Sequence, residues 1–76
     1  MVNKKLIKEL EACGFVRREL YGDLFLCLDV KEHELRYNTK TDNFYNEDTD
    51  GLQVEVWEGT FAQIAEKVLE LTGVTL

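Results

Sequence analysis

The residues with the clearest chemical potential lie in one turn-rich run of acidic and amide side chains. Asn46, Asp48 and Asp50 alternate along the chain, and Gly51 follows them directly. Oxygen ligands alternate in this way at the start of a calcium-binding loop, where a glycine permits the sharp turn. The glutamate that closes such a loop would fall at Trp57. The run therefore predicts a solvated turn, and we expect no metal ion there.

The single histidine and the two cysteines form no recognisable metal-binding, redox or catalytic motif. His33 has no second ligand at useful spacing, and Cys13 and Cys27 match no CxxC metal or redox motif. A nucleophilic site would also need a base positioned beside the thiol. We expect His33 to be a solvated residue between two strands and both thiols to be reduced, as is usual in the cytoplasm. The chain is therefore predicted to be neither an enzyme nor a cofactor-binding protein.

Acidic residues are concentrated in the middle of the chain. Between Asp29 and Glu58 there are nine carboxylates and three bases, and the difference equals the whole net charge of −6. Binding to nucleic acid or to anionic lipid requires a cationic surface, so we expect no direct contact with either. The longest apolar run, residues 24–28, is far shorter than the roughly 20 residues that span a bilayer. These features predict a cytoplasmic protein whose partners are proteins.

Helical periodicity is present at both ends of the chain. The first helix is predicted to begin after Asn3, which serves as N-cap, and to end before Gly14. The second is predicted to begin with a capping box formed by Thr60 and Gln63 and to end at Gly73.

The segment between the helices alternates in the manner of strands. The predicted strands span residues 15–20, 24–30, 34–38 and 52–57. A tight turn at Gly22 and Asp23 would place Tyr21 opposite Leu24, and residues 39–51 would form a loop or an irregular hairpin. We therefore predict one compact domain, residues 1–76, of the α+β class. Its architecture is a two-layer sandwich in which both helices cover one face of a three- to four-stranded antiparallel sheet.

The face of this sheet away from the helices is predicted to carry an unusual share of apolar side chains. Leu24, Leu26 and Leu28 share the helix-covered face, so the intervening residues point outward. An open antiparallel face is normally polar. The residues expected to contact a partner are Val16, Leu20, Phe25, Trp57, Tyr45, Asp48, Asp50 and Glu55.

Three functions are compatible with this surface. The leading hypothesis is a non-enzymatic module that binds a basic partner protein, or a second copy of itself, with apolar anchors giving affinity and carboxylates giving orientation. An alternative is a mimic of a nucleic-acid backbone, whose carboxylates would have to be spaced like phosphates along one surface. A metal-binding or enzymatic domain is the third and the least supported by the sequence.

Overall fold

The computed structural model describes residues 3–48 and 53–76 as two helices and one antiparallel sheet. The elements are α1 (Lys4–Ala12), β1 (Val16–Leu20), β2 (Asp23–Val30), β3 (His33–Asn38), β4 (Asn43–Asp48), β5 (Gln53–Trp57) and α2 (Phe61–Thr72). The strands lie in the sheet in chain order, β1-β2-β3-β4-β5. The predicted α+β class is confirmed. The sheet has five strands, more than expected, because residues 43–48 pair with β3 along its whole length.

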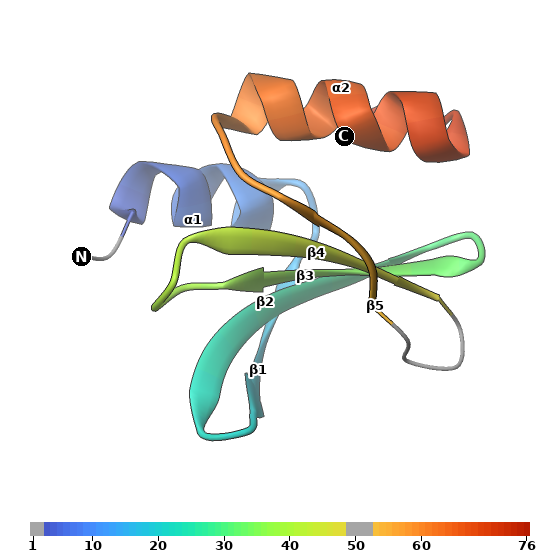
Figure 1. Cartoon of the computed structure of the whole chain (residues 1–76). Helices are drawn as coiled ribbons and strands as arrows, with labels where there is room; N and C mark the ends of the chain where they lie inside the picture. Colours follow the sequence, from blue (N-terminus) through green and yellow to red (C-terminus); the bar gives the residue numbers. More distant parts are fainter. Residues whose placement is uncertain (1–2, 49–52) are drawn as a thin grey trace.

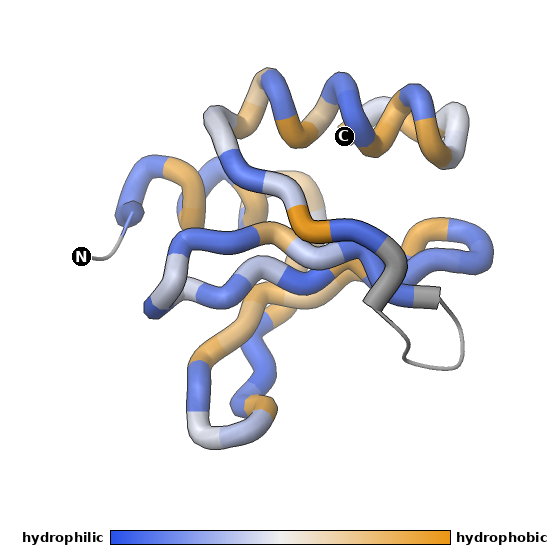
Figure 2. The backbone as a smooth tube through the Cα atoms, viewed as in Figure 1, coloured by the Kyte–Doolittle hydropathy of each residue, from blue (hydrophilic) through white to orange (hydrophobic). Residues whose placement is uncertain are grey.

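Both helices lie on the same side of the sheet, as predicted (Figure 1). In α2, the apolar segments face the sheet and the hydrophilic segments face solvent (Figure 2). Between the two layers lies one apolar core, to which α1 contributes Leu6 and Leu10, and α2 contributes Ile64 and Val68. The sheet supplies Leu26, Val30, Leu35, Tyr37, Phe44 and Trp57 to the same core.

The helix ends also follow the sequence prediction. The Asn3 side chain accepts a hydrogen bond from the backbone N–H of Leu6 at 3.1 Å. At the start of α2, the backbone N–H of Gln63 donates to the Thr60 hydroxyl, and the backbone N–H of Thr60 donates to the Gln63 side chain. Gly73 ends the helix in the left-handed conformation, which a residue without Cβ adopts at no steric cost.

The turn between β1 and β2 differs from the prediction by one position. Its central residues are Tyr21 and Gly22, with φ of 55° and 80°, so Leu20 lies opposite Asp23. Two consecutive residues of positive φ match the right-handed twist of the flanking strands. The pairing is thus shifted by two residues from the predicted one. Because side chains alternate with a period of two, the predicted faces are preserved.

The prediction that Trp57 lies on the outer face is wrong. Trp57 pairs with Phe44 and stacks on its ring, with centroids 6.1 Å apart, on the helix-covered side. Trp57 is only 5% exposed, whereas its neighbour Val56 is 45% exposed. Apolar residues occupy both odd and even positions of this strand, so either orientation of the strand leaves some of them on the outer face. Burying the indole removes more apolar surface from water than burying a valine does, so the fold places Trp57 inside.

Candidate functional site

The outer face of the sheet is crossed by one row of laterally paired residues. Val16, Cys27, Arg36, Tyr45 and Val56 are successive neighbours from β1 to β5. They share the face opposite the helices because each is adjacent in its strand to a residue that points into the core or toward α1. The two valines at the ends of the row are 58% and 45% exposed. The row therefore has an apolar side chain at each edge and a cation at its centre.

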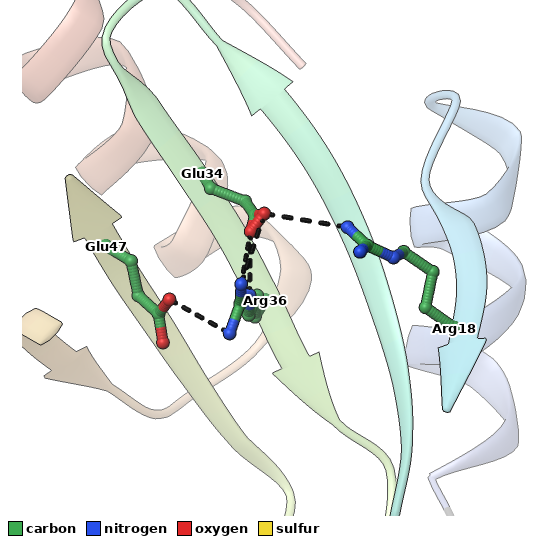
Figure 3. A network of polar contacts seen from close by, with 4 residues as sticks. All are labelled: Arg18, Glu34, Arg36 and Glu47. Carbon is green, nitrogen blue, oxygen red and sulfur yellow. Dashed lines mark hydrogen bonds and ion pairs between the residues drawn. The ribbon is translucent and has the colours of Figure 1, made fainter. Parts of the chain in front are cut away.

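That cation belongs to an ion-pair network of four residues on three strands (Figure 3). Arg36 holds Glu34 through Nε at 2.8 Å and reaches Glu47 through Nη1 at 3.0 Å. Arg18 approaches Glu34 from β1 at 3.7 Å. The side chains of Glu34, Arg36 and Glu47 are 12–19% exposed, but that of Arg18 is 50% exposed. Arg36 is thus the fixed centre of the network, and Arg18 is its solvated member.

The environment of Arg36 has two opposing effects on its pKa. Burial alone would lower the pKa of Arg36, since it penalises the charged form. The hydrogen bond and charge of Glu34, with the charge of Glu47, outweigh burial and raise that pKa above its ordinary value. The guanidinium therefore remains charged and pairs with both carboxylates beside it.

Apolar side chains lie on the same face as the network. The rings of Phe25 and Tyr45 lie 6.3 Å apart on this face, and Phe25 and Cys27 are both buried. Burial raises the pKa of the Cys27 thiol, so the thiol stays protonated near neutral pH. Next to them is a hollow of about 290 Å³ whose lining includes Val16, Arg18 and Cys27. The exposed Val16 side chain thus borders a concave, partly apolar surface, whose lining also includes Arg18 and Asp29.

The structure brings together half of the residues predicted to contact a partner. Val16, Phe25 and Tyr45 lie on the outer face, and Leu20 lies half-buried on the same face at the end of β1. Glu55 is exposed, but its pairing with Asn46 places it on the helix-covered side. Asp50 and the side chain of Asp48 lie outside the described residues.

His33 is placed differently from the expectation of a solvated position between strands. It is the first residue of β3, is half-buried, and its Nδ1 lies 2.9 Å from the Oδ1 of the buried Asn46. The side chains of residues alternate along β2 and β3, so His33 and the buried Cys27 lie on opposite faces of the sheet.

Three further features of the described residues bear on the candidate sites. Within residues 3–48 and 53–76, no three His, Cys, Asp or Glu side chains gather closely enough to hold a metal ion. Both helices of this part of the chain are too short and too polar to cross a membrane. Cys13 and Cys27 are both free thiols.

Comparison of the chain with protein-family models, with curated proteins and with solved structures gives no match. The residues themselves must therefore carry any functional argument.

The sequence prediction did not identify the ion-pair network. A signal for part of it was present, because Glu34 and Arg36 are two residues apart in a predicted strand and must share a face. Glu47 could not be added, because its segment was predicted to be a loop or an irregular hairpin. The register of β4 against β3 brings Glu47 beside Arg36.

Proposed function

We propose that the protein is a non-enzymatic module that binds a basic partner protein through the outer face of its sheet. The contact surface is the row from Val16 to Val56 together with the hollow beside Val16. The free thiols of Cys13 and Cys27 suit a reducing compartment, and a cytoplasmic location is part of this proposal.

The observation that carries the proposal is the position of Val16. A single exposed valine is ordinary on a protein surface. Here the side chain, 58% exposed, borders a hollow that also reaches the buried Cys27. A concave, partly apolar surface next to an exposed apolar side chain is the arrangement in which an anchor residue of a partner gains most from desolvation.

The charge of the face gives the partner its chemistry. Among the described residues, the outer face carries two bases, Arg18 and Arg36, and four acids, Asp23, Asp29, Glu34 and Glu47, which leaves two negative charges in excess on a molecule of net charge −6. A basic partner would be steered toward this surface over long range, and apolar contact would then hold it.

The test uses peptides selected from a random library on the immobilised protein and then measured by titration calorimetry. We expect the selected peptides to be rich in lysine or arginine with apolar anchors. The double variant Val16→Ser/Val56→Ser should bind them about tenfold more weakly. The matched control is Leu69→Ser/Leu71→Ser, which changes two aliphatic side chains of α2 that are similarly exposed. Equal binding by the wild type and the Val16/Val56 variant would contradict the proposal.

Self-association through the same face is the alternative form of this function, in which the partner is a second copy of the chain. The test must distinguish it from binding of a basic partner. Sedimentation equilibrium would show a dimer that the Val16→Ser/Val56→Ser variant loses. Such a dimer, with no binding of basic peptides, would replace the heterologous partner with a second copy of the chain.

Mimicry of a nucleic-acid backbone has less support. Two of the carboxylates that a mimic would present, on Glu34 and Glu47, are paired with Arg36. Glu55 lies on the other side of the sheet from them. Charges that are neutralised or divided between faces do not reproduce a row of phosphates.

A further inference from the structure

A second concave surface lies on the opposite side of the sheet, between α1 and the β1–β2 hairpin. The hairpin curves away from the helix layer toward its turn (Figure 1), so α1 does not fill the space above it. A groove of about 330 Å³ remains there, and its apolar lining, which we call the floor, consists of Ile7, Leu24 and Leu26. Leu26 is fully buried, whereas Leu24 is 37% exposed. The floor is therefore apolar and still reached by water.

The floor is held in shape by the neighbouring turn. Thr39 also lines the groove, and both its backbone N–H and its hydroxyl donate to the backbone carbonyl of Leu24, at 3.1 and 2.8 Å. The Asn38 side chain accepts from two backbone N–H groups of the same turn and donates to Asp23 at 3.2 Å. These hydrogen bonds fix the backbone position of Leu24 at the lining of the groove.

The rim of the groove is cationic, in contrast to the rest of the molecule. It carries three bases, Lys4, Lys8 and Arg17, and one acid, Glu11. Glu11 binds Arg17 through two hydrogen bonds of 3.1 and 3.3 Å. Among the described residues, neither Lys4 nor Lys8 forms an ion pair. Because these lysines are four residues apart on α1, they stand on the same side of the helix.

We propose that this groove binds an acidic peptide segment of a partner protein, with one apolar side chain on the floor and flanking carboxylates at Lys4 and Lys8. Lys4 and Lys8, which form no ion pair among the described residues, would attract a negatively charged group. Ile7 and Leu24 would contact an apolar group. A free fatty acid has the same two features. Small-molecule sites, however, enclose most of their ligand, and the exposed Leu24 shows that this groove is open along one side. A peptide anchors one side chain in such a groove and keeps its backbone in water.

The probe is a capped hexapeptide, Glu-Glu-Leu-Phe-Glu-Glu, titrated into the ¹⁵N-labelled protein at low salt. We expect amide shifts to cluster at Ile7, Lys8, Leu24 and Thr39, and the affinity to fall as salt is added. A second hexapeptide, with Gly-Gly in place of Leu-Phe, should bind at least about fivefold more weakly because it leaves the floor empty. A third, with lysines in place of the glutamates, should not bind in the groove.

Matched variants of α1 separate the groove from general electrostatics. Lys8→Glu should weaken the first peptide at least about fivefold, and Lys8→Gln by about two- to threefold. Lys5→Glu changes the net charge equally on the same helix, but Lys5 does not line the groove, so the change should be below about twofold. Both Lys5 and Lys8 are exposed, so the fold should tolerate either change.

Several outcomes would overturn the proposal. Equal losses for Lys8→Glu and Lys5→Glu would show that only net charge matters. Amide shifts confined to the outer face would show that the acidic hexapeptide binds there and not in the groove. Decanoate that binds the groove while the peptide does not would identify an anionic lipid as the ligand. A dimer that Lys8→Glu abolishes would identify a second copy of the chain. The proposed function would survive all of these results except binding of the acidic peptide at the outer face, which would also contradict its preference for a basic partner.

Discussion

The two concave surfaces of this protein lie on opposite sides of one sheet and differ in whether their charged side chains are paired. On the outer face, Arg36 lies between Glu34 and Glu47, and each of these charges has a partner within the protein. At the groove beside α1, Lys4 and Lys8 form no ion pair among the described residues. Paired charges fix the local structure, whereas unpaired charges remain available to a ligand. Under the two proposals, apolar contact holds the partner at the first surface, and unpaired lysines attract the partner at the second.

The difference originates in the register of the strands. Glu34, Arg36 and Glu47 come from two central strands, where neighbouring strands restrict side chains on both sides. Lys4 and Lys8 project from α1 beside a groove whose hairpin side, formed by Arg17, Leu24 and Leu26, offers them no carboxylate. A net charge of −6 therefore does not describe either surface. Local geometry decides which charges a partner can meet.

The largest expected effect on the free energy of unfolding comes from the residue of β5 that the fold buries. Trp57→Ala should lower the free energy of unfolding by about 3–5 kcal/mol, because it leaves a cavity against Phe44. Val56→Ala should lower it by less than about 1 kcal/mol, since this side chain is half in water. Urea denaturation followed by circular dichroism measures both. If Trp57→Ala does not fold, Trp57→Phe keeps a ring on Phe44 and should still cost more than Val56→Ala; equal costs would contradict the observed register.

The next effect tests whether the outer network has one centre. Arg36→Met should destabilise the fold by about 2–3 kcal/mol, because it leaves Glu34 and Glu47 side by side with little access to water. Arg18→Met removes the same charge from a side chain that is half exposed, and should cost no more than about 0.5 kcal/mol. The free energies of unfolding come from urea titrations at constant salt. Similar losses for the two variants would mean that the network has no dominant member.

The smallest effect concerns Tyr37, which lies under the helices and donates its hydroxyl to Asp42. Burial, the hydrogen bond and the charge of Asp42 raise the pKa of Tyr37 well above its ordinary value of about 10. A raised pKa in the folded state stabilises the protein fully below the pKa of the unfolded chain, and this contribution is lost as the pH rises above it. Tyr37→Phe should cost about 1–2 kcal/mol at pH 7.

The difference in unfolding free energy between the wild type and Tyr37→Phe should depend on pH. At pH 11 the unfolded wild type ionises at this tyrosine, so the advantage of the wild type over Tyr37→Phe should shrink by about 1.4 kcal/mol. The pKa of the Cys27 thiol is also raised by burial, and its contribution declines above about pH 8.5 in both proteins equally. Urea midpoints at pH 7 and pH 11 measure the change. A difference that stays constant with pH would contradict the buried, neutral state of Tyr37.

The sequence predicted the fold class because the local signals at the chain ends are strong. The N-cap at Asn3 and the capping box at Thr60 are fixed by short-range hydrogen bonds, and both are present in the structure. The position of Trp57 was not predictable in the same way. The strand carries apolar residues on both alternations, and only its pairing with Phe44 decides which of them is buried.

The candidate sites were predictable only in part, for a related reason. Val16 and Phe25 were placed on the outer face because a shift of two residues in a hairpin does not change the side. The groove was missed because it depends on the curvature of the hairpin away from α1, which no local pattern encodes. The cations of its rim are spread from Lys4 to Arg17 and look unremarkable in a chain dominated by acidic residues.

The most direct test of the division between the two surfaces is one set of ¹H–¹⁵N spectra of the wild-type protein, recorded with each class of peptide in turn. A selected basic peptide should shift the amides of Val16, Cys27, Tyr45 and Val56 and leave Ile7 and Leu24 unchanged. The acidic hexapeptide should do the reverse. Shifts from both peptides on the same face of the sheet would contradict the assignment of separate roles to the outer face and the groove.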